Sequence, residues 1–172
     1  MSPSLETREL VLHHEEMVRV RPLRPTDRAI YERAVLDLSP RSRYLRFFAP
    51  IPRLSKRMLD QMTQIDGHRH VAYVALTPDE SSAVGVVRYV LEPDHLDSGE
   101  VAIAIADDWQ RRGLGGRLLQ QTIEHAQLAG LKSLTATTLC ENTGAAGLLR
   151  ASGFSAAGAS GLYAEHRMRL RA

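Results

Sequence analysis

Cysteine and lysine are scarce in this chain of 172 residues. The single cysteine, Cys140, excludes a disulfide within the chain, and the only lysines are Lys56 and Lys132, so arginine carries almost all of the positive charge. The formal net charge is only +2 at pH 7. We therefore do not expect the strong overall attraction to nucleic acid that a highly basic protein has.

Long apolar segments are also missing. No apolar run approaches the roughly 18 residues that indicate a membrane-spanning helix, and the first residues, 1–6, lack the basic and then apolar order of a secretory signal. Together with the lone cysteine, these features lead us to expect a cytoplasmic bacterial enzyme with no membrane partner.

Metal and nucleic-acid sites are not indicated either. The histidines include His13, His14 and those of segment 68–70, but none shows a His-x-x-x-His spacing on a convincing helix, so we expect no metal. Basic and aromatic residues alternate over 41–57, as on some RNA-binding surfaces. A helix that buries its aromatic residues and leaves arginines such as Arg46 in solvent explains the same pattern. We do not expect nucleic-acid binding.

A glycine-rich segment is the most informative feature that the chain does have. Its sequence is Gln-Arg-Arg-Gly-Leu-Gly over residues 110–115. Residues 100–106 before it alternate like a strand, and residues 114–126 after it carry apolar side chains at helical spacing up to a stop at Gly130. Backbone N–H groups and the positive end of the helix dipole bind phosphate at such a helix start. The segment therefore predicts a phosphate-bearing ligand.

The spacing excludes two common phosphate loops. A P-loop has Lys and then Ser or Thr after its glycines, whereas Gly116 precedes Arg117 and Leu118. A dinucleotide-binding loop has Gly or Ala where Leu118 stands, and it needs an acidic residue at the end of a second strand, which neither Glu124 nor Glu141 provides. The remaining pattern is Gln-x-x-Gly-x-Gly. The alternative to a phosphate-binding role is that this segment forms a turn with only a structural role.

A second motif covers residues 141–154 and follows a strand-like run at 133–139. Asn142 suits the N-cap of a helix, and Gly153, followed by Phe154, suits the position just after its end. The two motifs together resemble those of GNAT N-acetyltransferases. Segments 21–27 and 38–48 look like the acetyltransferase domain of bacterial protein-lysine acetyltransferases, although we expect no fused regulatory domain here.

The resemblance covers residues 17–170 and implies the α/β (α+β) GNAT fold. We expect one domain over 1–172, with 1–16 as an extra strand or tail. Its sheet is expected to be mixed, mostly antiparallel and twisted, with six to seven strands flanked by helices. A V-shaped splay is expected between the strand that ends near 106 and the strand that starts near 133. The composition also predicts turns at 77–82 and 93–99 and a last strand within 161–170.

The resemblance implies acetyl-CoA as the co-substrate. Its pantetheine arm would pair with the backbone of 103–105, and its pyrophosphate would lie on the N–H groups of 111–116, where glycines allow close approach. The two arginines of the motif would add charged contacts to phosphate, with a solvent-facing side chain as the alternative for each. The expected cofactor-binding residues are Ile103, Ala104, Ile105, Arg111, Arg112, Gly113, Leu114, Gly115, Gly116 and Asn142.

Glu100 is the candidate catalytic residue. Direct transfer needs a neutral amine, and a lysine with a pKa near 10.4 is only about 0.04% neutral at pH 7. The resembling enzymes use a Glu at this strand position as the base, directly or through a water; a surface glutamate paired with an arginine is the alternative. A backbone N–H near Ile105 is expected to stabilise the oxyanion.

Two further residues affect the expected chemistry. Leu149 stands where many members of the family carry a Tyr that protonates the departing thiolate, so that acid is missing. Cys140 suggests either an acyl-cysteine intermediate or, as we expect, a small buried thiol at a strand end.

Three functions stay open on the sequence alone. We expect acetyl transfer to a protein lysine by a monomer or homodimer. Transfer to a small amine, such as an amino acid, a polyamine or an aminoglycoside, is the alternative. A non-catalytic acyl-CoA sensor is the third possibility, because Leu149 removes an expected acid.

Overall fold

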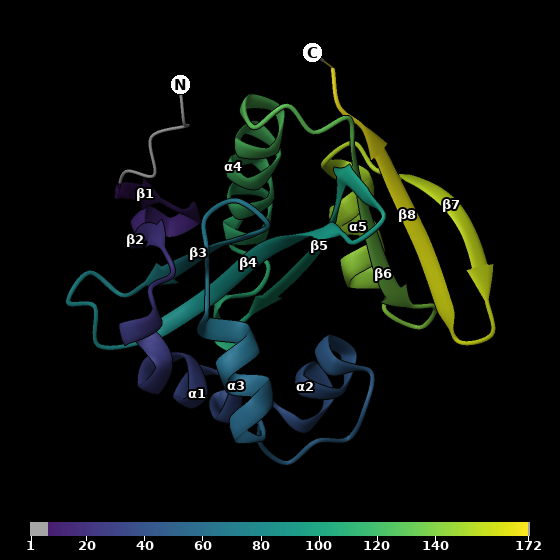
Figure 1. The fold of residues 1–172 in the computed structure, drawn as a ribbon. Coiled ribbons are helices and arrows are strands. Elements are labelled where there is room, and N and C mark those ends of the chain that lie inside the picture. The colour runs from purple at the N-terminus through teal and green to yellow at the C-terminus, as the bar shows by residue number, and fades with distance from the viewer. Residues whose placement is uncertain (1–6, 172) are drawn as a thin grey trace.

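The computed structural model describes residues 7–171. Figure 1 shows a twisted sheet with helices on both faces. The strands are β1 (Arg8–Val11), β2 (Met17–Pro22), β3 (His70–Leu76), β4 (Ala83–Glu92), β5 (His95–Ile105), β6 (Ser133–Leu139), β7 (Ser155–Ser160) and β8 (Tyr163–Arg169). The α-helices are α1 (Arg28–Asp37), α2 (Pro40–Phe47), α3 (Lys56–Thr63), α4 (Leu114–Leu128) and α5 (Thr143–Ala151). No helix in this described part is long and apolar enough to cross a membrane.

The sheet is divided by an incomplete strand pairing at its centre. Its eight described strands lie in the order β1-β2-β3-β4-β5-β6-β8-β7, and β5 and β6 form the one parallel pair. These two strands pair only where 98–100 meets 133–135. Beyond Glu100 they separate, which leaves one edge of β5 unpaired. The predicted mixed sheet and its V-shaped splay are confirmed.

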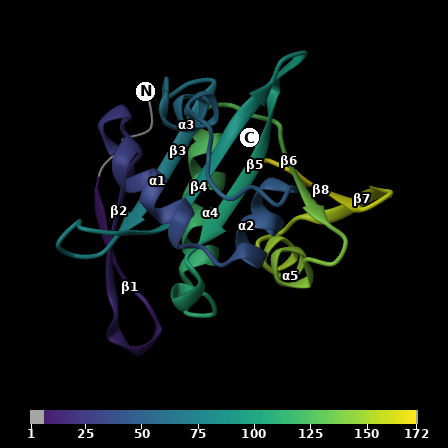
Figure 2. The same cartoon turned by 90° about the horizontal axis from the view of Figure 1, so that it is seen from below.

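Helices cover the two faces of the sheet unequally. In Figures 1 and 2, α4 lies on one face and α1, α2 and α3 on the other. Strand β3 contributes side chains to the hydrophobic cores on both faces of the sheet. Its residues Val71, Tyr73 and Ala75 pack on the α4 side. Val74 and Leu76 pack toward α1 and α3. This two-sided burial explains why β3 reads as a continuous apolar run rather than as an alternating one.

A buried ion pair joins β2 to the start of α1. The guanidinium of Arg21 donates to both carboxylate oxygens of Asp27 at 2.7 and 2.9 Å, and both side chains are less than a tenth exposed. Asp27 also accepts from the backbone N–H of Arg24 at 2.7 Å. Burial alone would raise the pKa of Asp27, but these hydrogen bonds outweigh it and lower the pKa below its usual value.

Three expectations about the fold need correction. The sheet has eight described strands rather than six to seven, because β7 was missed: every residue of Ser155–Ser160 is exposed, so the segment has no apolar alternation to mark it. The turn expected at 93–99 is wrong, since β5 already begins at His95 and the hairpin is tighter. Arg46 is only partly exposed and faces inward, whereas we expected it among the solvated arginines.

Candidate functional site

The glycine-rich segment forms the start of α4. Gly113 adopts φ +86°, a left-handed conformation that glycine accommodates without strain, and α4 begins at the next residue. No side chain among the described residues caps this helix. Its first backbone N–H groups therefore stay available to a ligand, and the positive end of the helix dipole lies beside them.

A groove of about 410 Å³ opens at this helix start. Its walls come from the unpaired end of β5, from the loop before α4, from the starts of α4 and α5, and from α2. This volume is in the usual range for small-molecule sites. The expected cofactor residues that line the groove are Ile103, Ala104, Ile105, Arg111, Gly113, Gly115, Gly116 and Asn142.

The register of β5 turns backbone groups into the groove. Ala106 donates its N–H to the carbonyl of Val84 at 2.9 Å. Bonded and non-bonded pairs alternate along an antiparallel ladder, so the backbone groups of Ile103 and Ile105 point away from β4. The carbonyl of Ile105 accepts from the side-chain amide of Gln110 at 3.1 Å. An extended ligand therefore finds strand-like partners along this edge.

Asn142 places a second helix start on the same groove. Its Oδ1 accepts from the backbone N–H of Ala145 at 3.0 Å, so it is the N-cap of α5 as the sequence predicted. The next residues, Thr143 and Gly144, also line the groove.

Asp107 anchors α2 beside the groove, which we did not expect from the sequence. Its carboxylate accepts from the Ser39 backbone N–H and from the Ser39 hydroxyl at 2.9 Å each, and from the Ser42 hydroxyl at 2.6 Å. Burial would raise the pKa of Asp107, but the Ser42 and Ser39 hydrogen bonds lower it below its usual value. The contact spans more than sixty residues of sequence, so no local pattern could indicate it.

Two expected cofactor residues lie outside the groove lining. The Arg112 guanidinium forms an ion pair with Glu16 and lies 5.4 Å from the centre of the Trp109 ring. Leu114 is only 1% exposed and belongs to the core under α4. The N–H of His13 donates to the Arg112 carbonyl at 3.3 Å. The segment between β1 and β2 thus contacts the loop before α4. Of the two arginines in the motif, Arg111 is the one that lines the groove.

Glu100 lies where β5 and β6 separate. Its side chain is exposed, and its Oε1 accepts from the Thr137 hydroxyl at 3.2 Å across the splay. It does not line the groove itself. It shares a face of β5 with Ala102 and Ala104, the face that looks toward α1 and α2, because side chains alternate along a strand.

Leu149 and Cys140 supply no group to the groove. Leu149 is 3% exposed and packs in the core, so α5 offers no acid at that position. Cys140 is exposed, with its sulfur 3.9 Å from the Gly161 carbonyl, and it does not line the groove. The expectation of a buried thiol is wrong, because β6 ends at Leu139 and Cys140 lies in the following turn. Over residues 7–171, no group of three or more His, Cys, Asp or Glu side chains could hold a metal ion.

Comparison with known proteins decides the family. The sequence model of the acetyltransferase (GNAT) family matches residues 36–154. The chain belongs to this family. Acetyltransferases of the GNAT family use acetyl-CoA as the donor and an amine as the acceptor, and the matched region contains both motifs and the whole of the unpaired edge of β5.

Individual GNAT relatives agree with this assignment. Acetyltransferase PA5475 from Pseudomonas aeruginosa is 33% identical over 139 residues, which is 80% of this chain and 74% of that protein. Acetyltransferase Pat from Mycolicibacterium smegmatis is 25% identical over 127 residues, 74% of this chain but only 38% of that longer protein. The crystal structure of the GNAT domain of PAT from S. lividans superposes with a TM-score of 0.91 at 25% identity, over 99% of this chain and 100% of that one.

Proposed function

We propose that this protein transfers an acetyl group directly from acetyl-CoA to a primary amine. The observation that carries the proposal is the groove between the unpaired edge of β5 and the uncapped start of α4. One wall offers strand-like hydrogen bonds to the pantetheine amides, and the other offers N–H groups to the pyrophosphate. Arg111 adds a positive charge on the same groove.

The reaction follows from this placement. With pantetheine along 103–105, the thioester carbonyl lies near the free N–H groups of β5, which stabilise the oxyanion of the tetrahedral intermediate. The amine nitrogen attacks the carbonyl carbon, the C–S bond breaks, and CoA leaves as a thiolate. A thiol of ordinary pKa near 8.5 leaves without a side-chain acid, so Leu149 is compatible with transfer.

Glu100 is the proposed base. It lies on the face of β5 that carries Ala102 and Ala104, whose small side chains leave room for an acceptor. Because Glu100 is exposed and does not line the groove, it takes the amine proton through a water rather than by direct contact.

The acceptor has two candidates. The resemblance to protein-lysine acetyltransferases favours a protein lysine. A small cavity lined by Arg46 and Arg88 favours a small amine that carries a carboxylate. Both acceptors undergo the same reaction at the same groove.

Replacing Glu100 by Gln is expected to lower turnover at neutral pH by a factor of about ten or more, because general bases contribute at least this much. Acetyl-CoA affinity should not change, since Glu100 lies outside the groove lining. Release of CoA, measured with a thiol reagent, and calorimetric titration with acetyl-CoA give the two quantities. Raising the pH should restore part of the lost rate, because more of the amine is then neutral.

The matched control for this variant is Glu124→Gln, which makes the same change at an exposed position of α4. It should leave turnover unchanged. If Glu100→Gln behaves like the control on the true acceptor, Glu100 is not the base.

A further inference from the structure

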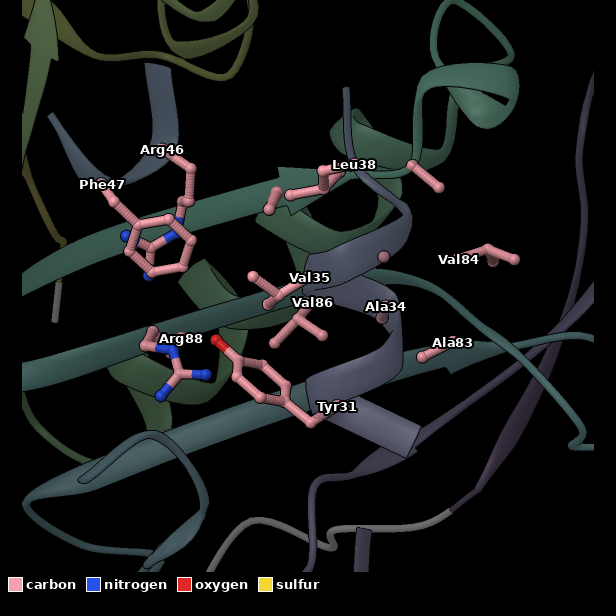
Figure 3. Close-up of a pocket in the computed structure, with 13 residues that line it drawn as sticks. Tyr31, Ala34, Val35, Leu38, Arg46, Phe47, Ala83, Val84, Val86 and Arg88 are labelled. Atoms are coloured by element: carbon pink, nitrogen blue, oxygen red, sulfur yellow. The ribbon is translucent and has the colours of Figure 1, made fainter. Parts of the chain in front are cut away.

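A small cavity adjoins the acetyl-CoA groove on the α1 and α2 side of the sheet (Figure 3). Leu38, Arg46 and Ala104 line both spaces, so the two lie next to each other. The cavity has a volume of about 30 Å³, which is room for about two water molecules. It therefore suits the end of a ligand, such as a carboxylate, and not a whole ring or chain.

Arg88 of β4 is buried at this cavity with part of its guanidinium unused. The residue is 3% exposed. Its Nη1 donates to the Met62 carbonyl at 2.9 Å and lies 3.0 Å from Nε2 of His70, while its buried Nη2 has no hydrogen-bond partner among the described residues. Burial, and to a lesser extent the charge of Arg88, lowers the pKa of His70 to about 4. His70 is therefore neutral, and its Nε2 accepts the hydrogen bond from Arg88.

Arg46 of α2 brings a second cation to the same cavity. It forms no hydrogen bond or ion pair with any residue that the structure describes, and its guanidinium carbon lies 4.9 Å from the centre of the Phe47 ring. Burial lowers the pKa of Arg46, and burial together with the charge of Arg46 lowers the pKa of Arg88 to about 10. In Figure 3 the Tyr31 hydroxyl points toward the same space as the two guanidinium groups.

Arg88 is buried and Arg46 is partly buried, and placing two cations together in this way is costly. Nine ion pairs occur in the described chain, and neither Arg46 nor Arg88 takes part in one. The charge of Glu100 acts on Arg46 and raises its pKa against burial, but no carboxylate of the described residues bonds to Arg88, and a buried charge without such a partner is destabilising. An anionic ligand would give the Nη2 of Arg88 a partner and would add to the negative charge near Arg46.

The proposed base lies on the same face of the sheet. Arg88 faces Ala102 across the β4–β5 ladder, so Glu100 is its diagonal neighbour, at about 7 to 8 Å between backbones. The Glu100 carboxylate bonds to Thr137 of β6 and does not neutralise Arg88. The Glu100 carboxylate and the guanidinium groups of Arg46 and Arg88 therefore lie near one another, next to the proposed position of the thioester. This arrangement is complementary to a zwitterion.

We propose that Arg46 and Arg88 bind a carboxylate of the acceptor, so that the acceptor is an amino acid or a similar amine that carries a carboxylate. This inference rests on the proposed function, because the acetyl group of acetyl-CoA is uncharged and only the acceptor then brings an anion to the cavity. The acceptor's carboxylate occupies the space between the two guanidinium groups, and its amine faces the thioester on the Glu100 side.

Matched acceptor pairs test this inference. Release of CoA from acetyl-CoA is measured with L-amino acids and with the amines formed by removing their α-carboxylate, for example phenylalanine and 2-phenylethylamine. For the wild type, kcat/KM should be at least about ten times higher for the acid of a preferred pair, since charge-assisted hydrogen bonds contribute about 1.5–3 kcal/mol. Arg88→Met should remove this preference through KM and leave the affinity for acetyl-CoA unchanged.

Two variants keep the test interpretable. Arg43→Met removes an arginine of α2 that donates to the Pro52 carbonyl and lines neither space, so it should keep the preference. Arg46→Met replaces the half-buried partner and should also lose the preference, which keeps the test valid if Arg88→Met fails to fold. A thermal melting curve establishes the fold of each variant.

The outcomes separate this inference from the proposed function. The carboxylate assignment is overturned if the protein uses both members of every pair equally, or if it binds acetyl-CoA but acetylates neither member. Neither result overturns the proposed function. The wild type could instead prefer succinyl-CoA to acetyl-CoA, with Arg88→Met abolishing that preference. This result would show that the two arginines bind a carboxylate of the donor, and it would also overturn the assignment to the acceptor. Absence of acetyl-CoA binding overturns the proposed function itself.

Discussion

Replacing Gly116 by glutamate is expected to weaken acetyl-CoA binding about a hundredfold or more without harming the fold. Gly116 lies in the first turn of α4 and lines the groove, and a Cβ built there meets no atom within 4 Å. The new carboxylate extends toward the space proposed for the pyrophosphate. Placing like charges together costs several kcal/mol, and each 1.4 kcal/mol is a factor of ten in affinity.

The fold should tolerate this change for local reasons. Glutamate has a higher helix propensity than glycine by up to about 1 kcal/mol, and a negative charge in the first turn interacts favourably with the helix dipole. Calorimetry with acetyl-CoA and thermal melting measure the two effects. Gln127→Glu, which adds the same charge near the other end of α4, should bind acetyl-CoA normally. Normal binding by Gly116→Glu would show that the phosphates do not lie on this helix start.

Asp27→Asn is expected to produce the largest loss of stability, about 3 to 5 kcal/mol in the free energy of unfolding, because it leaves a buried guanidinium without its partner. Arg21 keeps the partly exposed Glu80, whose carboxylate lies 3.3 Å from its Nε, and the Pro22 carbonyl, which accepts from its Nη1 at 3.1 Å. Urea unfolding at pH 7 measures the loss. The matched control is Asp37→Asn in the exposed pair with Arg33 on α1, where we expect at most about 1 kcal/mol. Equal losses in both variants would contradict the assignment.

The same ion pair predicts a dependence of stability on pH. Hydrogen bonds lower the folded-state pKa of Asp27 despite its burial, so its contribution is fully present above the unfolded-state pKa near 3.9. This contribution is lost as the pH falls through the lower folded-state pKa. The wild type should therefore lose more stability than Asp27→Asn between pH 5 and strongly acidic solution, as measured by urea unfolding at each pH. Parallel pH profiles for the two proteins would be inconsistent with this ion pair.

Local chemistry explains which parts of the fold the sequence predicts. Asn142 was predicted as the N-cap of a helix, and its side chain accepts a hydrogen bond from the N–H three residues later. The glycine-rich start of α4 and the splay between β5 and β6 were also predicted, although not the residue at which the two strands separate. These features depend on neighbouring residues or on a recurrent motif, so they are visible in a single sequence.

Contacts between distant segments explain what the sequence did not predict. β7 is a strand because it pairs with β8, although none of its residues is buried. Arg112 bonds to Glu16, which lies 96 positions earlier, and no local pattern indicates this contact. The Arg46 and Arg88 cavity joins α2 to β4. One signal was present for it: Arg88 is the only charged residue in the apolar run 83–91, and a charge inside a buried strand indicates a special role.

Backbone amide exchange tests the central claim most directly, because it reads the groove without knowledge of the acceptor. Hydrogen exchange of the wild-type protein is measured with and without saturating acetyl-CoA. We predict slower exchange at Ile103, at Ile105 and over 114–116, where free N–H groups meet pantetheine and phosphate. Unchanged exchange at these positions, or protection confined to other parts of the chain, would contradict the proposed acetyl-CoA site.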